Sequence, residues 1–339
     1  MGCIMQIKIN RKILSSFGCF LAMIAIISFF IFILKFLSKD RMLGGMLYTG
    51  DNLNQHSIQT AGQQKNNYSE KYQRPSGQPE LSNPFTLQTF INSENTITFQ
   101  DPEDVIYAYY GILKEASDMY GYSGGCGTVG EADIPYPYAY RLFTSKARQE
   151  MSLQEFKDSF RGTGHITFLQ IHSLPIPPET PADTRYFMVE IEVITGRQVK
   201  NDTISSEEQI SYFAYYFGIV TVEKGEDGWG IQEINYYPEN FLCAPYHGWD
   251  YDAEVMVNIV FKDNLKVIDQ IMNRVEKDGM IYIFAPGGKR QYRFDFVRLT
   301  NGHDILINEN IMINGKWRPT ELLTADWKYL KLQKSLFTS

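Results

Sequence analysis

Cysteine and histidine are the residues of this sequence with the most reactive side chains. Cys126 lies in a glycine-rich stretch, Gly121–Gly127. Its thiolate would be a nucleophile if His165, His172 or His247 acted as its base. No cysteine–histidine family signature surrounds Cys126, and the stretch lacks the lysine and Ser/Thr of a phosphate-binding P-loop. We therefore interpret Gly121–Gly127 as a connector between elements.

Only two of the four cysteines, Cys126 and Cys243, lie away from the apolar N-terminal region that holds Cys3 and Cys19. In an oxidising compartment these two would form a disulfide, and otherwise they would stay free thiols. The sequence leaves both alternatives open, and four cysteines are too few for a disulfide scaffold.

A dense aromatic turn near residue 247 and two late tryptophans are further candidates for a site. His247 with Asp250 and Asp252 is a weak ligand set, so we predict a packed turn and no metal or other cofactor. Trp317 and Trp327 would bind a glycan only if both were exposed on one face. Packing is the default interpretation of these rings.

The strongest signal is an uncharged stretch of 22 residues, Ile13–Leu34. As a helix it would span roughly 33 Å, close to the ~30 Å hydrocarbon core of a bilayer. It is longer than the apolar core of a signal peptide, and no A-x-A-like cleavage site follows it. We predict an uncleaved transmembrane helix that anchors the chain in the lipid bilayer.

Charge does not give the orientation of this helix, because basic residues flank both of its ends. From the architecture of a short tail (1–12), one span and a large remainder, we predict a cell-membrane protein with an extracytoplasmic body. Residues 35–84 are rich in Gly, Pro, Gln and Asn and predict a flexible linker.

The net charge is −7, but residues 1–45 carry +5, so the remainder carries −12. An acidic body argues against nucleic acid as a partner, because binding phosphates requires a basic face. It also argues against a body that lies on an anionic membrane.

The sequence pattern of residues 85–244 predicts an α+β domain. Phe85–Phe99 is expected to contribute an edge strand. Asp101 is expected to cap a helix that begins with Pro102, and Ser152 with Glu155 forms a capping box. A further helix is expected over 138–148. Four stretches then show the two-residue period of strands, and they are 165–174, 187–194, 209–223 and 229–236. Helices packed in the concavity of a bent antiparallel sheet would form a cone.

Residues 245–339 predict a smaller helix-plus-sheet α+β domain. Apolar spacing over 250–278 indicates one long amphipathic helix or two abutting ones. The stretches 281–285 and 291–299 read as strands, and Asn301-Gly302 and Asn314-Gly315 as tight hairpin turns.

The order of these elements resembles the nuclear transport factor 2-like superfamily over residues 100–240, as a membrane-anchored bacterial member. The resemblance rests on a capped helix with paired tyrosines (Val105-Ile-Tyr-Ala-Tyr-Tyr110), a helix ending Ser-Leu-Gln-Glu-Phe-Lys157, and long strands, the last opening Gly-Trp-Gly-Ile-Gln-Glu-Ile234. The superfamily includes isomerase-like enzymes, small-ligand binders and inert scaffolds. Its membrane-anchored members resemble assembly subunits of secretion and conjugation machines.

The resemblance implies where a site would lie. An enzymatic member would use the interior of the cone, with a carboxylate base and a tyrosine donor. Tyr109, Tyr212, Tyr216 and Glu190 are the matching pocket candidates. The alternative is that Glu190, together with Glu192, faces water on the polar side of its strand.

We therefore expect a non-catalytic scaffold or binding protein of a bacterial cell-envelope assembly of the secretion or conjugation type. Its partners would be other envelope proteins or further copies of itself. The rival is a small-ligand-binding or isomerase-like cone with an interior pocket. The sequence does not decide whether the chain is an enzyme, although no catalytic motif is evident.

Overall fold

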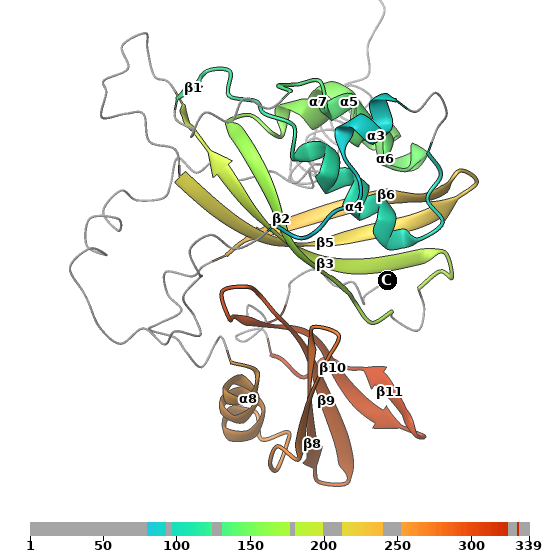
Figure 1. Ribbon diagram of the computed structural model, residues 1–339. Coiled ribbons are helices and arrows are strands. Elements are labelled where there is room, and N and C mark those ends of the chain that lie inside the picture. The colour runs from blue at the N-terminus through green and yellow to red at the C-terminus, as the bar shows by residue number, and fades with distance from the viewer. Residues whose placement is uncertain are drawn as a thin grey trace, which may run out of the picture. The chain divides into compact units, whose positions relative to one another are not determined.

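The computed structural model describes residues 80–92, 97–123, 131–176, 180–198, 212–239, 252–324 and 331. These residues form an α+β fold with two larger antiparallel sheets and few helices. Both sheets belong to one compact unit, residues 43–339. Figure 1 labels most of the elements.

The first sheet has the strand order β2-β3-β5-β6. Its strands are β2 (Thr163–Ser173), β3 (Thr184–Thr195), β5 (Tyr212–Gly225) and β6 (Gly228–Pro238). Every pair is antiparallel, and β3 pairs with β5 over its whole length. A separate two-stranded ribbon joins β1 (Tyr122–Ser123) to β4 (Arg197–Gln198).

Short helices cover one face of the first sheet, as Figure 1 shows. They are α3 (Leu87–Ile91), α4 (Pro102–Leu113), α5 (Tyr136–Arg141), α6 (Ser145–Glu150) and α7 (Leu153–Asp158). The predicted caps are confirmed. Asp101 accepts from the Glu103 amide at 3.0 Å, and Ser152 forms a capping box with Glu155. These contacts satisfy amides that have no partner within the helix.

Two predictions in this region are wrong. The stretch expected as an edge strand contains helix α3, which opens with a capping box between Thr86 and Thr89. The helix expected over 138–148 is two helices. Thr144 interrupts it, because its side chain caps α6 while its amide donates to the Ile231 carbonyl at 2.8 Å.

The second sheet has the order β11-β10-β9-β8-β7. Its strands are β7 (Asn273–Lys277), β8 (Met280–Gly287), β9 (Arg290–Arg298), β10 (Asp304–Ile313) and β11 (Lys316–Pro319). Helix α8 (Ala253–Met256) continues into the π-helical segment η3 (Val257–Asn264) and packs on one face. The predicted helix over 250–278 is therefore wrong beyond residue 264. Lys266 adopts a positive φ of 54°, and the chain then enters β7.

The predicted transmembrane segment, Ile13–Leu34, and the predicted linker up to residue 79 lie outside the described residues. Among the residues that are described, no helix is both long and apolar enough to cross a membrane.

Candidate functional site

The face of the first sheet that carries no helices packs against the second sheet through a layer of aliphatic side chains. Leu174, Met188 and Ile219 come from the first sheet, and each is at most 3% exposed. The second sheet supplies a matching apolar set, which consists of Met280, Val297, Leu299, Ile305 and Ile307. We call this layer and the polar groups within it the junction. Burial of so much apolar surface stabilises the pairing of the two sheets.

A buried carboxylate lies at the centre of the junction. Glu190 on β3 is 0% exposed. Its Oε2 accepts from the Thr300 amide at 2.9 Å and from the Gln170 side chain, and its Oε1 accepts from the Thr300 hydroxyl. Gln170 also donates to the Arg298 carbonyl at 3.0 Å. A buried carboxylate is tolerated only when it is hydrogen-bonded, so Glu190 ties β3 to the β9–β10 loop.

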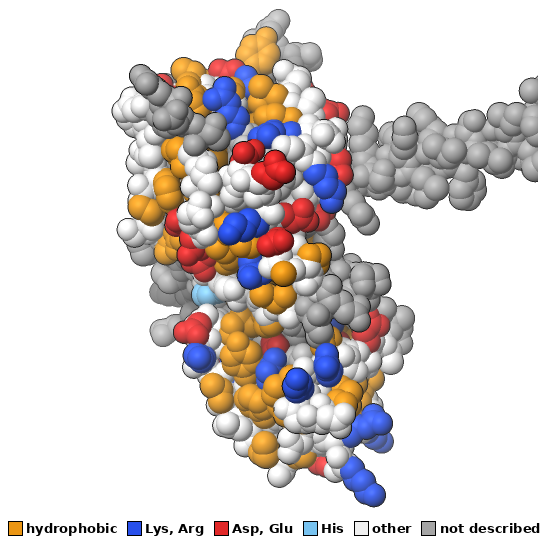
Figure 2. Space-filling view, turned by 90° about the vertical axis from the view of Figure 1, so that its right-hand side faces the viewer, with side chains coloured by type: hydrophobic (Ala, Val, Ile, Leu, Met, Phe, Trp, Pro, Cys, Tyr) orange, Lys and Arg blue, Asp and Glu red, His pale blue; other side chains and the backbone are white. Residues whose placement is uncertain are grey.

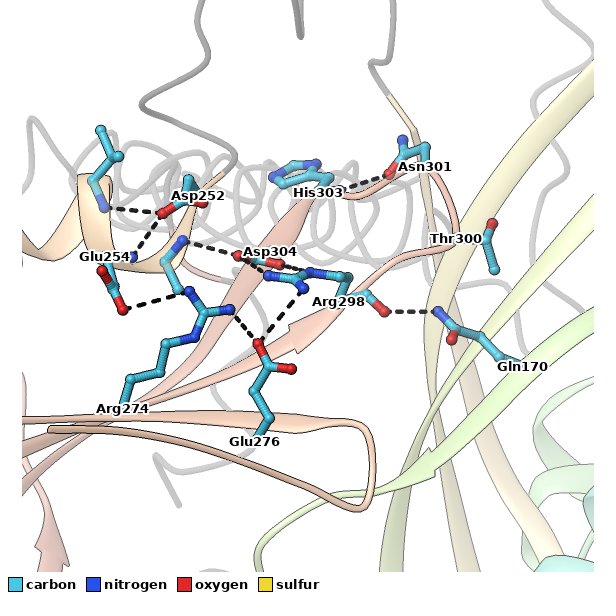
Figure 3. Close-up of polar contacts among 12 residues, drawn as sticks. Gln170, Asp252, Glu254, Arg274, Glu276, Arg298, Thr300, Asn301, His303 and Asp304 are labelled. Atoms are coloured by element: carbon cyan, nitrogen blue, oxygen red, sulfur yellow. Dashed lines mark hydrogen bonds and ion pairs between the residues drawn. The ribbon is translucent and has the colours of Figure 1, made fainter. Parts of the chain in front are cut away.

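An alternating chain of charges lies beside this carboxylate on the second sheet (Figure 3). Glu254 of α8 lies 3.5 Å from Arg274 of β7, which also pairs with Glu276. Glu276 lies 3.6 Å from Arg298. Arg298 donates two hydrogen bonds to the Asp304 carboxylate, from Nε at 2.6 Å and from Nη2 at 3.0 Å. Its hydrogen bond to Asp304 raises the pKa of Arg298. Each charge has an opposite neighbour, so the set positions α8, β7, β9 and β10 relative to one another.

Two histidines border the junction. His172 Nε2 lies 3.0 Å from Gln170 Oε1, and its ring packs against Gly279 in the β7–β8 turn. A groove of about 430 Å³ opens there, between β2 and the β7–β8 hairpin. His303 lies in the β9–β10 loop, and burial lowers its pKa to about 3. Burial also lowers the pKa of His172. Both imidazoles are therefore neutral at physiological pH.

The structure places the described pocket candidates on both sides of the first sheet. Tyr109 and Tyr216 face the helices, where Tyr216 pairs across strands with Ile191. Glu190 points to the opposite face of the same sheet, because neighbouring residues of a strand alternate. The alternative prediction, that Glu190 faces water, is wrong, because this side chain is 0% exposed and accepts from Thr300 of the β9–β10 loop. The side chain of Tyr212 lies outside the described part of the chain, as do Cys126 and Cys243.

Aromatic rings fill the helix-covered face where the interior pocket was expected. Tyr110 stacks on Phe168 with ring centroids 4.3 Å apart, and Tyr136 stacks on Phe160 at 5.1 Å. Tyr109 packs edge-on to Phe143 at 5.6 Å, and burial raises its pKa well above the ordinary value. Among the described residues, the Tyr109 hydroxyl has no hydrogen-bond partner. The interior is therefore a packed core.

An open groove of about 830 Å³ lies at one end of this core, beside the loop after α4 and helix α7. Its lining includes Tyr122, Tyr136, Asp133, Lys157 and Arg161. The Lys157 ammonium lies 2.9 Å from the Asp133 carboxylate. The hydrogen bond from Lys157 lowers the pKa of Asp133. None of the predicted pocket residues lines the groove.

Sequence reasoning missed Gln170 and Thr300, the partners of Glu190. Glu190 was a visible signal, because it interrupts an apolar strand. Glu192 interrupts the same strand and remains partly exposed, so the pattern alone did not distinguish them. Across the described ranges, no group of three His, Cys, Asp or Glu side chains is placed to hold a metal ion.

Comparison with known proteins adds little. No protein-family model matches the sequence, and no curated protein matches it either. Among solved structures, one described as an Ntf2 like protein involved in plasmid conjugation is similar at 8% sequence identity. The match covers 62% of this chain and 92% of that chain, with a TM-score of 0.21. A score of that size shows neither fold nor function. The described residues define an α+β protein of two joined antiparallel sheets.

Proposed function

We propose that this chain is a membrane-anchored, non-catalytic binding component of a bacterial cell-envelope assembly of the secretion or conjugation type. Ile13–Leu34 would hold it in the bilayer, and the two-sheet body would lie outside the cytoplasm. The observation that supports this most is the use of Glu190. A carboxylate suited to catalysis is instead buried in the junction, where it accepts hydrogen bonds from Thr300.

The packed aromatic face supports the same proposal. An isomerase-type protein needs a cavity that admits substrate beside its base. Here the rings of Tyr110 and Phe168 stack within that face, and Glu190 lies on the other side of the sheet. Joined sheets instead provide a body with fixed surfaces for partners, which is what an assembly component requires.

The test uses the full chain in a bacterial host. Alkaline extraction of membranes should leave the chain in the pellet, whereas a variant lacking residues 13–34 should be released. Crosslinking of intact cells, followed by purification under denaturing conditions, should give adducts heavier than the chain. Recovery of the monomer alone, over a range of crosslinker lengths, would contradict the role in an assembly.

The second candidate function is small-ligand binding in the 830 Å³ groove, which is large enough for a metabolite. The observation in its favour is Tyr136, which lines the groove, is 1% exposed, and has a hydroxyl without a partner among the described residues. Native mass spectrometry of the purified full chain tests it. A bound small molecule that is lost in Tyr136→Phe would favour this function over the first.

A further inference from the structure

One end of the second sheet is basic, although the body as a whole is acidic. Antiparallel pairing places the β8–β9 and β10–β11 turns at the same end, away from the β9–β10 loop that reaches Glu190. Four exposed side chains lie in or beside these turns, and they are Lys289, Arg290, Lys316 and Arg318. We call these four residues the basic end. None of them forms an ion pair with a described residue.

The neighbouring segment after η3 adds to this charge. Asp269 accepts from the Gly288 amide at 3.1 Å, which places residues 266–269 against the β8–β9 turn. Lys262 and Lys266 lie in or just after η3 and are exposed, as are Asp263 and Asp269. Within the described residues at this end of the sheet, positive side chains therefore outnumber negative ones. In Figure 2, Lys and Arg lie over both the upper and the lower part of the molecule, and in the lower part they are accompanied by hydrophobic side chains and by few Asp or Glu.

Apolar side chains lie within this basic region. Ile313, at the β10–β11 turn, is 48% exposed, and Trp317 on β11 is partly exposed. The Arg293 guanidinium lies over the rings of Trp317, at 5.2 Å, and Tyr282, at 5.3 Å. Asp295 holds that guanidinium through bonds of 2.6 and 2.9 Å. Lys316 and Arg318 flank Trp317 in β11 and point to the other face of that strand together with Ile313. An aromatic ring with Lys and Arg nearby is the combination found at the interface between membrane and water.

Within residues 46–339, the excess of positive charge is confined to the C-terminal part. Residues 46–285 hold 17 Lys and Arg against 33 Asp and Glu, whereas residues 286–339 hold nine against five. A nucleic acid that extends beyond the basic end would also approach the acidic surfaces of the body, which repel its phosphates. A flat anionic surface would touch the end of the sheet alone, so charge complementarity favours a membrane over a polyanionic chain.

We propose that the basic end docks on anionic lipid headgroups, with Ile313 and Trp317 at the level of the headgroups. This inference rests on the proposed function, because the anchor supplies the proximity. A coil over residues 35–79 would reach roughly 35 Å, which keeps the surface at high effective concentration near the basic end. The acidic net charge of the body argues against a membrane contact by the body as a whole. It does not argue against a contact made by the basic end alone, because the positive charges there are local.

The experiment uses the full chain in nanodiscs, with Ile313→p-benzoylphenylalanine as a photocrosslinker. One set of nanodiscs contains phosphatidylcholine alone, and the other contains an equal share of phosphatidylglycerol. Crosslinking to lipid should be at least about tenfold stronger with phosphatidylglycerol and should fall at high salt, because each of the four basic residues adds about fivefold to binding near an anionic surface. The same photocrosslinker in place of the exposed Ile134 of the first domain should give no such difference.

Two variants that change charge equally provide the control. Lys289→Glu/Lys316→Glu should lower the lipid crosslinking by about 25-fold or more, since two factors of about fivefold are lost. Arg141→Glu/Lys146→Glu, in exposed positions of the first domain, should keep it. Equal crosslinking in both lipids, or equal loss in both variants, would overturn the docking proposal. So would displacement of the lipid crosslink by a single-stranded oligonucleotide. Failure of the chain to copurify with nanodiscs at all would instead contradict the anchor.

Discussion

The two faces of the first sheet are buried in different ways. The helix-covered face is closed by aromatic rings, and Phe156 alone lies within 6.4 Å, centroid to centroid, of five other rings. The opposite face buries aliphatic side chains around one carboxylate that is bonded to another element. The first arrangement depends on shape and volume. The second depends on a few directional hydrogen bonds, so it specifies which surface of the second sheet packs on the first sheet.

Removing a ring should test the helix-covered face with the largest effect. Phe156 is 0% exposed, so Phe156→Ala should destabilise the chain by about 3–5 kcal/mol through lost burial and a cavity. Urea unfolding of the full chain in detergent measures this. The control is Tyr120→Ala, whose ring is 94% exposed and whose loss should change stability by less than about 0.5 kcal/mol. Similar losses in both variants would show that the aromatic packing is not the source of stability.

The junction should respond to a single carboxylate. Glu190→Ala removes the acceptor of three buried hydrogen bonds, from the Thr300 amide, the Thr300 hydroxyl and the Gln170 side chain, which should cost about 2–4 kcal/mol. Hydrogen exchange should rise first in the β9–β10 loop and in β2, with the helix-covered face still protected. Glu192→Ala is the matched control, because Glu192 is on the same strand and face but is partly exposed. If the two variants lose stability equally, the comparison between the faces fails.

Local signals predicted the parts of the fold that local chemistry decides. The caps at Asp101 and Ser152 and the period of β3 were readable, because each depends on neighbours in sequence. The stretch after Asn264 was misread, because apolar spacing there fits a helix as well as a strand that pairs with β8. Glu190 was visible, but its partner Thr300 is 110 residues away, and only tertiary packing decides that contact.

A glycine contact tests how tightly the junction is packed. Gly279 has a φ of 75°, and a Cβ there would lie 2.0 Å from a ring carbon of His172. Gly279→Ala should therefore cost about 2 kcal/mol, the sum of backbone strain and the lost contact between His172 and Gln170. Gly315→Ala has the same strain at a φ of 74° with nothing nearby, and should cost about 1 kcal/mol. Equal losses of stability in the two variants would mean that the β7–β8 turn is not closely packed against β2.

The smallest effect expected near neutral pH is a proton effect at the junction. Burial holds the pKa of His303 at about 3, below its ordinary value of 6.5. The unfolded chain therefore binds the proton first, and stability is complete above pH 6.5 and falls as the pH drops towards 3. By pH 6 the loss should be less than about 1 kcal/mol. His303→Gln removes this titration, so the stability difference between wild type and variant should shrink between pH 8 and pH 6. A difference that stays constant over that range would show that the β9–β10 loop does not keep this imidazole neutral, and would remove this pH sensitivity from the junction.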